Sequence, residues 1–225
     1  MKLSKRLTAI VKATELTPYD HIWDCCCDHG YLGQQLMLQH PNSQIHFVDV
    51  VPHLIEQVEA QLITSSLSNW QCHCLDAADI ELTNLAGKNQ KHLIIIAGVG
   101  GDLLMDMVKA IYNEHSDRPN KPDLDFILCP VRQLHTVRQG LLDLELGLIS
   151  EQIIQDNKLF YEVIHVSSQS AQAVSLVGNH MWNFSNSDHQ TYRQIMMDHY
   201  QKQPNSLAKK LLSLYQALTE SDQLS

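Results

Sequence analysis

Four short stretches of the sequence place acidic side chains or glycines where a nucleoside could be bound. The first is WDCCCDHGYLG at residues 23–33, and Asp49 lies in HFVDV about twenty residues later. Asp76 lies in CLDAAD, and AGVGG occupies residues 97–101. An acid at the position of Asp49 can accept hydrogen bonds from both hydroxyls of a ribose. One such Asp alone is as consistent with a helix cap, so the regular recurrence carries the interpretation.

The type of nucleoside follows from what these stretches lack. The loop after Asp24 has no G-x-G-x-x-G, and G-x-x-x-x-G-K-[ST] occurs nowhere in the sequence. Both patterns serve to hold phosphates at a helix N-terminus. An adenosine without phosphates therefore fits better than a dinucleotide. S-adenosylmethionine is such a ligand, with its ribose at Asp49, its adenine near Asp76 and its methionine end over the first loop.

The segments around these stretches predict an α/β protein with a mostly parallel, Rossmann-like sheet. Short apolar runs at 21–26, 44–48, 70–74, 92–96 and 125–128 alternate with helical patterns at 30–39, 53–65, 102–114 and 131–145. Four consecutive strands would then end in an acid or a glycine turn, at the edge where doubly wound sheets bind ligands. Runs at 148–155 and 160–166, split by Asp156-Asn157-Lys158, predict a closing antiparallel hairpin.

The two ends of the chain are expected to be helical. Residues 186–225 show two apolar stripes separated by Pro204, which predicts a helical hairpin that pairs its stripes or docks on the domain formed by 1–185. Near the N-terminus, Leu3, Leu7, Ile10 and Val11 fall on one helix face. The opposite face would carry the densest group of basic side chains, suited to phosphate contact or to solvent alone: Lys2, Lys5, Arg6 and Lys12.

Four separated motifs, in this order and spacing, resemble the bacterial tRNA (adenine(22)-N(1))-methyltransferase family. They are KLSKRL at 2–7, CDHGYL at 27–32, IAGVGG at 96–101 and FYEVIHV at 160–166, so the similarity covers nearly the whole chain. The resemblance implies a class I methyltransferase that uses S-adenosylmethionine and has a C-terminal helical extension that helps to hold tRNA. By position, the resemblance places Asp24, Asp28 and His29 in the first motif, Asp49 as the ribose-binding acid, Asp76 as the acid on the adenine side, and Gly98, Gly100 and Gly101 at the turn beside the transferred methyl. We expect catalytic roles for Asp28 and His29, and further cofactor contacts from Cys26, Gly30, Val50 and Ala77.

The chain also departs from this family. Cys26 replaces a loop glycine, and its β-carbon would crowd the cofactor if the backbone there needs a positive φ. Gly30 and Gly33 stand where the family tends to have other small or rigid residues. Two alternatives therefore stay open: a methyltransferase of the same fold acting on another RNA position or a small molecule, and a non-catalytic RNA-binding protein whose loop no longer holds the cofactor.

The chemistry of the acceptor favours a ring nitrogen. AGVGG lacks the Asn-Pro-Pro-Tyr type of motif that holds exocyclic amines, whereas N1 of adenine already offers a lone pair. The protein must then align N1 with the methyl group and accommodate a developing positive charge, a task that suits the carboxylate of Asp28. We expect Lys5, Arg6, Tyr31 and Arg132 to contact the RNA, although Tyr31 could pack on the sheet and Arg132 could simply begin a helix.

Composition sets outer limits. The chain has 225 residues, 16 basic and 25 acidic, so its net charge of −9 argues against a generally basic surface and an RNA partner needs a local basic face. No long apolar run or signal peptide is recognisable, which predicts a cytoplasmic protein with no membrane contact, and no obligate protein partner is evident.

The six cysteines lack paired C-x₂-C spacing, so buried thiols are favoured over zinc. Most of the thirteen histidines, such as His92, His165 and His180, are interpreted as scattered and without partners.

Overall fold

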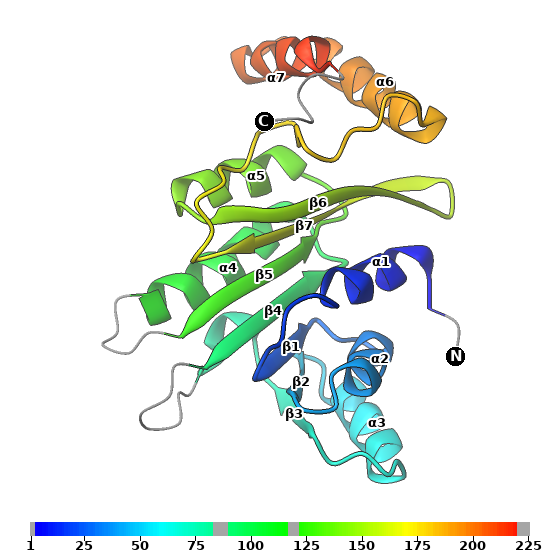
Figure 1. Cartoon of the computed structure of the whole chain (residues 1–225), viewed down its shortest axis with the longest axis vertical. Helices are drawn as coiled ribbons and strands as arrows, with labels where there is room; N and C mark the ends of the chain where they lie inside the picture. Colours follow the sequence, from blue (N-terminus) through cyan, green and yellow to red (C-terminus); the bar gives the residue numbers. More distant parts are fainter. Residues whose placement is uncertain (1–2, 83–89, 117–121, 220–225) are drawn as a thin grey trace.

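A seven-stranded sheet forms the centre of the protein in this computed structural model, which describes residues 3–82, 90–116 and 122–219. The strand order is β3-β2-β1-β4-β5-β7-β6 (Figure 1). The strands are β1 (His21–Cys25), β2 (Gln44–Asp49), β3 (Trp70–Cys74), β4 (Lys91–Ala97), β5 (Asp123–Cys129), β6 (Gly147–Asp156) and β7 (Leu159–Ser167). The helices are α1 (Lys5–Ala13), α2 (Tyr31–Gln39), α3 (Pro52–Ile63), α4 (Gly101–Ser116), α5 (Leu134–Asp143), α6 (Ser187–Gln201) and α7 (Ser206–Ala217), with a 3₁₀ turn, η1 (Ala77–Asp79).

The pairing of the strands confirms the predicted fold class. Strands β1 to β5 pair in parallel, and β7 runs antiparallel between β5 and β6. The expected closing hairpin is therefore present. Its turn contains Asn157 and Lys158 at positive φ, which is the conformation a tight connection needs. Because parallel strands are covered on both faces, their apolar runs located them to within one or two residues.

Two predicted boundaries are wrong because a residue takes the left-handed conformation. Cys26, included in the first strand, has φ 57° and leaves the sheet, so β1 ends at Cys25. The helix expected from residue 131 begins only at Leu134, since its N-cap Gln133 has φ 59°. Neither residue is a glycine, and so the sequence contains no signal for these turns.

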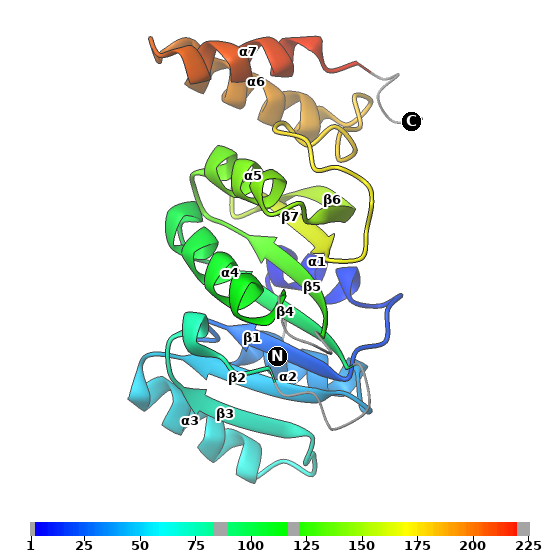
Figure 2. The same cartoon turned by 90° about the vertical axis from the view of Figure 1, so that its left-hand side faces the viewer.

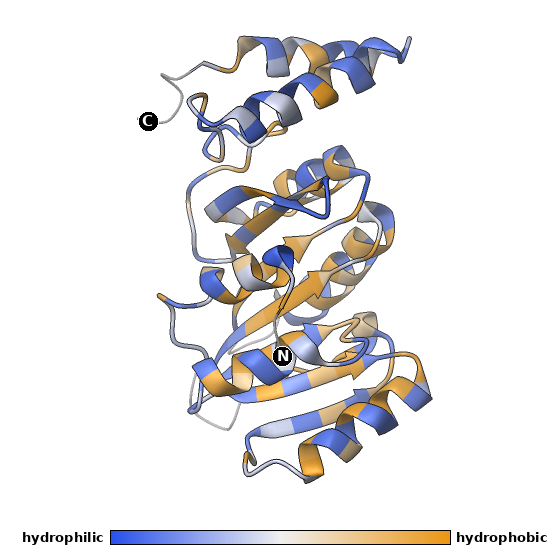
Figure 3. Ribbon diagram, turned by 90° about the vertical axis from the view of Figure 1, so that its right-hand side faces the viewer, coloured by the Kyte–Doolittle hydropathy of each residue, from blue (hydrophilic) through white to orange (hydrophobic). Residues whose placement is uncertain are grey.

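Helices cover the sheet on both faces. Helices α1, α2 and α3 lie on one side and α4 and α5 on the other, as Figures 1 and 2 show. On the first side Ile10, Leu36 and Val58 pack with Phe47 of β2. The second core combines side chains of β1, β4 and β5 with those of α4 and α5. Figure 3 shows the corresponding pattern of hydrophobic strands beneath helices with hydrophilic outer faces.

The C-terminal helices both pair with each other and dock on the sheet, so the two arrangements left open by the sequence occur together. Tyr200 of α6 and Tyr215 of α7 stack at 5.9 Å, and both belong to one buried cluster with Trp182 and with Ile153 of β6. Asn186 and Asn205 cap the two helix N-termini with their side chains. The predicted segment runs to residue 225, and its last six residues lie outside the described chain.

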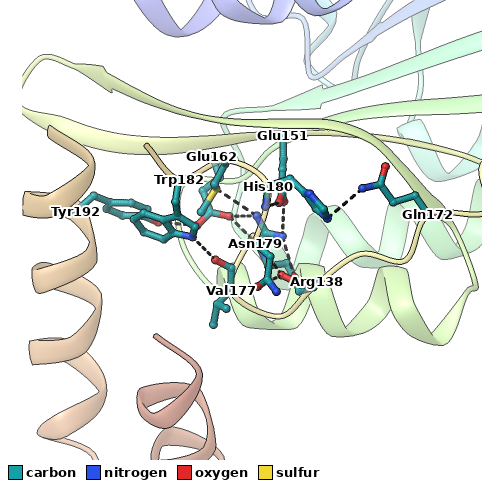
Figure 4. Close-up of polar contacts among 11 residues, drawn as sticks. Arg138, Glu151, Glu162, Gln172, Val177, Asn179, His180, Trp182 and Tyr192 are labelled. Atoms are coloured by element: carbon teal, nitrogen blue, oxygen red, sulfur yellow. Dashed lines mark hydrogen bonds and ion pairs between the residues drawn. The ribbon is translucent and has the colours of Figure 1, made fainter. Parts of the chain in front are cut away.

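A buried cluster of charges attaches this extension to the sheet (Figure 4). The guanidinium of Arg138 donates to Glu162 at 2.6 and 2.9 Å and to Glu151 at 2.7 Å, and all three side chains are fully buried. Tyr192 of α6 donates its hydroxyl to the other oxygen of Glu162 at 2.8 Å. Glu151 also accepts the backbone N–H of His180. The connection between β7 and α6 is thus held by buried charges that compensate one another, and loss of one partner would leave another buried charge unpaired.

The histidines are not isolated, which corrects the interpretation drawn from the sequence. His165 lies 3.2 Å from the hydroxyl of Tyr19, which donates to the buried Asp125. The His180 ring meets the amide of Gln172, and the nitrogen Nδ1 of His92 accepts from the Trp23 indole. The partners of His165 and His92 come from distant positions in the chain, so their proximity depends on the strand order, whereas Gln172 and His180 lie in the same connecting segment.

Candidate functional site

A pocket of about 260 Å³ opens where β1 and β4 end. Its floor and walls come from the loop after β1, the start of α2, the turn after β4 and the inner side of α1. In an α/β sheet this is the edge at which ligands bind. The lining residues are Arg6, Leu7, Asp24, Cys26, Cys27, Asp28, His29, Tyr31, Leu32, Ala97, Gly98 and Val99.

Asp24 is a buried carboxyl group at the bottom of this pocket. It is 3% exposed, and its Oδ2 accepts the backbone N–H of Gly33 at 2.8 Å. Burial raises its pKa to about 7, with a smaller contribution from nearby Asp49, while the Gly33 hydrogen bond acts in the opposite direction. A cation placed beside this group would stabilise its charged form.

The loop between β1 and α2 has an unusual backbone. Cys26, Asp28 and Gly30 all have positive φ, at 57°, 52° and 69°. The conformation that would make a β-carbon at residue 26 crowd a ligand is therefore present, and Cys26 lines the pocket. For non-glycine residues this backbone costs on the order of 1 kcal/mol each. A β-carbon at Gly30 would approach Val58 to 2.9 Å, so glycine is needed there.

Asp49 fixes the shape of that loop from the end of β2. Its Oδ2 accepts the N–H of Asp28 at 3.0 Å, and its Oδ1 accepts the N–H of Val51, also at 3.0 Å. Each carboxylate oxygen keeps a second lone pair. Asp49 does not line the pocket itself, and Val50 beside it is 60% exposed.

Asp28, His29 and Tyr31 stand together at the rim. The His29 ring lies 5.6 Å from that of Tyr31, and its Nε2 is 3.6 Å from Oδ1 of Asp28. An acid just before a helix often caps it, but Asp28 does not cap α2, which has Gly30 as its N-cap and no side-chain capping bond. The Asp28 side chain is 70% exposed and therefore free to meet a second molecule.

The three glycines after β4 have different surroundings. Gly98 lines the pocket with φ 88°, and the Arg6 guanidinium lies 3.9 Å from where its β-carbon would be. A β-carbon at Gly101 would meet the carbonyl oxygen of Gln133 at 2.5 Å, and one at Gly100 would meet Arg132 at 3.0 Å. Gly100 and Gly101 thus allow the start of α4 to pack against the turn that follows β5.

Asp76 and Ala77 also lie outside the pocket. The Asp76 side chain is exposed and caps η1 by accepting the N–H of Ala78 at 2.9 Å, which is the structural role that such an acid often has. Ala77 is buried against the core on the α4 side. Both residues follow β3, the edge strand of the sheet, two strands away from the pocket at β1.

Arg6 lies apart from the solvent-facing basic side chains of α1. Its guanidinium is 5.0 Å from the centre of the Tyr161 ring on β7 and lines the pocket, and its backbone N–H donates to Asp156. Lys5 and Lys12 are exposed, whereas Lys2 lies outside the described residues. Sequence reasoning missed Tyr161 as a neighbour of the site, although it belongs to the FYEVIHV motif, because helical periodicity shows nothing of which strand a helix packs on.

Two other kinds of site are absent from the described residues. No group of three or more His, Cys, Asp or Glu side chains is placed there to hold a metal ion. No helix in that part of the chain is long and apolar enough to span a membrane.

Comparison with known proteins agrees with the fold. Across 96% of this chain it resembles Mycoplasma capricolum TrmK in complex with S-adenosylhomocysteine, with 97% of that chain covered, a TM-score of 0.74 and 15% identity. The Bacillus subtilis m1A22 tRNA methyltransferase TrmK gives a TM-score of 0.69 at 21% identity, with 96% and 94% of the chains covered. A putative tRNA (m1A22) methyltransferase of Streptococcus pneumoniae in complex with S-adenosylmethionine gives 0.68 at 16%, with 96% and 99% covered.

Sequence comparison identifies the family. No curated protein sequence matches the chain significantly. The profile of the methyltransferase domain matches residues 3–164, which extend from α1 to the last strand and include every residue that lines the pocket. The chain belongs to the methyltransferase domain family.

Proposed function

We propose that this protein transfers a methyl group from S-adenosylmethionine to N1 of an adenosine in tRNA, with adenosine 22 as the first candidate. The observation that carries the proposal is the pocket at the ends of β1 and β4, lined by acids and a glycine turn in a methyltransferase domain. Its support comes from the resemblance in fold, over nearly the whole chain, to TrmK structures, of which the Bacillus subtilis protein is named as an m1A22 tRNA methyltransferase.

The residues around the pocket suit a cationic adenosine derivative. Asp24 and Asp28 supply carboxyl groups on the loop side, where an ammonium and a sulfonium would be stabilised. The free lone pairs of Asp49 are available to ribose hydroxyls, and Asp76 stands at the next strand end for the adenine. Cys26 narrows the pocket without closing it.

The bound cofactor would supply an electrophilic methyl group, which the N1 lone pair attacks, leaving a neutral thioether and a cationic N1-methyladenine. Asp28 is then the group that responds to the developing charge. Its exposed carboxylate can accept a hydrogen bond from the adenine amino group, which becomes more acidic as the ring becomes cationic. Tyr31 and His29 offer rings beside it for a base that has left its helix.

In this proposal Arg6 and Lys5 contact different phosphates of the RNA. Arg6, held over Tyr161 at the pocket, suits the phosphate of the nucleotide that enters. Lys5 faces solvent on the same helix, and Arg132 lies exposed after β5, where each can meet more distant phosphates.

Methylation of defined transcripts tests the proposal. The purified chain is incubated with methyl-labelled S-adenosylmethionine and unmodified tRNA, and the product is mapped by reverse-transcription stops, because N1-methyladenosine blocks pairing. We expect one stop in the wild-type reaction, none with a transcript in which adenosine 22 is replaced by guanosine, and a much weaker stop with Asp28→Asn.

The other outcomes identify the rivals. Methylation at a different nucleotide would support methyl transfer to tRNA but would reject adenosine 22 as the target. Cofactor binding without transfer to any tRNA would favour a different acceptor, and absence of cofactor binding would favour a non-catalytic RNA-binding protein.

A further inference from the structure

A row of imidazoles crosses three neighbouring strands on the α4 side of the sheet. Nε2 of His73 on β3 lies 3.0 Å from Nδ1 of His46 on β2, and Nε2 of His46 lies 2.9 Å from Nδ1 of His21 on β1. The Trp23 ring stacks on His46 at 3.7 Å, and His21 stacks on His92 of β4 at 4.6 Å. We call His21, His46 and His73 the histidine row.

The hydrogen bonds of the row limit how many protons it can carry. Each link needs one nitrogen with a proton and one without, and a neutral imidazole has one of each. The row can take up one extra proton without losing a hydrogen bond. The two outer nitrogens, Nε2 of His21 and Nδ1 of His73, then both carry a proton, and each of the two imidazole–imidazole hydrogen bonds still has one. A second added proton must place two N–H groups opposite each other at one link. The row therefore loses a hydrogen bond and gains a repulsion at that step.

The surroundings also oppose charge. Burial, and then the neighbouring imidazoles, lower the pKa of His46 to about 2, and burial likewise lowers the pKa values of His21 and His73. His92 lies behind His21, and burial is the main cause that lowers its pKa to about 3.

Several other groups face these rings. His115 of α4 stands beside His92 and adds a further unfavourable neighbour. Asp20 and a hydrogen bond from His21 to Gln90 act the other way, by favouring a proton on His21. Asp79 and Glu81 stand exposed at the rim of the hollow of about 400 Å³ that the row lines.

The row has a regular relation to the ends of its strands. His21, His46 and His73 each stand three residues before an acid, namely Asp24, Asp49 and Asp76. Three residues of strand span about 10 Å and reverse the face on which a side chain lies. On β1 and β2 the row therefore lies behind Asp24 and Asp49, on the opposite face, whereas Asp76 lies beyond the end of β3. Its two hydrogen bonds join the three strands and oppose slippage of one strand past the next.

We propose that the histidine row is an acid-sensitive lock, which holds β1, β2 and β3 together while it carries at most one proton and releases them when a second proton enters. Strands β5, β6 and β7 contain no member of the row and are not released with them.

Hydrogen exchange and unfolding of the full chain test the lock. Between pH 7.5 and 5.5, after correction for the intrinsic exchange rate, we expect amide protection in β1–β3 to fall at least 10-fold more than in β5 and β7. In His46→Phe, which keeps a flat ring on Trp23 but cannot bond or titrate, this difference should disappear. The unfolding constant of the wild type should rise steeply in acid, and His46→Phe should reduce that rise by about 10-fold per pH unit, the effect of one proton.

Controls separate the lock from a general acid effect. His53→Phe changes an exposed histidine of α3 and should leave the wild-type pattern unchanged. His73→Phe removes an end of the row at a half-buried position and should act as His46→Phe does, should the latter fold poorly. Equal loss of protection in all strands, or the same acid dependence in the row variants as in the wild type, would overturn the proposal.

Discussion

The backbone N–H of Gly33 donates a 2.8 Å hydrogen bond to the buried carboxyl of Asp24, which joins the first strand to the first turn of α2. Gly33 is required for this approach, because a β-carbon there would lie 2.3 Å from the Phe47 ring. One hydrogen bond does not offset the burial of the charge, and the pKa of Asp24 is raised from 3.8 to about 7. The protein thus keeps a carboxyl group at the pocket although the burial of its charged form destabilises the folded state.

That destabilisation predicts that Asp24→Asn stabilises the protein above pH 7. The folded chain holds a proton on Asp24 that the unfolded chain loses from about pH 4 upwards, so its contribution to stability declines as pH rises from 3.8 to 7. The full penalty is on the order of 4 kcal/mol. The asparagine oxygen still accepts from Gly33, so urea unfolding at pH 8 should show a gain of that order, shrinking towards pH 4. An equal effect at both pH values would contradict the assigned pKa.

The affinity for the cofactor should increase with pH, whereas the contribution of Asp24 to stability decreases. A cationic ligand next to Asp24 favours the ionised carboxyl, so affinity should increase as pH rises through 7 and then level off. Calorimetry in two buffers of different ionisation enthalpy should show proton release at pH 6.5 and little at pH 8.5. Asp24→Asn should abolish that release, and its persistence in the variant would assign the proton to another group.

Asp49 is predicted to act on both the cofactor and the loop. Asp49→Ala removes the acceptor for Asp28 and Val51, and cofactor binding should weaken by about 1.5 to 3 kcal/mol. Glu59→Ala, an exposed acid on the neighbouring α3, is the matched control and should change nothing. Unchanged calorimetric affinity in Asp49→Ala would remove this residue from the site.

Asp28→Asn is predicted to separate catalysis from folding. The side chain is exposed and caps no helix, so stability and cofactor affinity should stay near those of the wild type. The methylation rate should fall by about 10² or more, the scale of a lost electrostatic or acid/base contribution. Single-turnover kinetics with saturating tRNA measure this directly. If most of the turnover remains, the carboxylate has no part in the reaction.

RNA binding should depend on the exposed lysines of α1. Replacing Lys5 and Lys12 by Glu is expected to raise the dissociation constant for tRNA and to make its logarithm less dependent on salt, by about one unit of slope for each phosphate that is no longer neutralised. Lys109→Glu on α4, on the other side of the sheet, is the control. Deletion of residues 186–225 is a poorer test, since it uncovers Trp182 and leaves Glu162 without Tyr192. Equal salt dependence in the α1 variant would place the RNA elsewhere.

The sequence was informative where one residue type has one main use. Buried parallel strands must be apolar, so the strands of the sheet were predicted closely. It was uninformative where the outcome depends on which strands become neighbours. Nothing local indicates that His21 and His46 bond to each other, or that Arg6 lies over Tyr161. Left-handed Cys26 and Gln133 were missed because tertiary contacts, and not residue type, impose their backbone.

The position of α1 has a consequence for how the protein is made. This helix packs on β6 and β7, and Arg6 bonds to Asp156, 150 positions further along the chain. At roughly 5 to 20 residues per second, the ribosome needs about 8 to 30 s to supply that partner. Throughout this interval the apolar side of α1 lacks the two strands that cover it in the folded protein, although β1 and β2 are synthesised early within it. The position of α1, which brings Arg6 and Leu7 to the pocket, is thus completed only after the last hairpin has been synthesised.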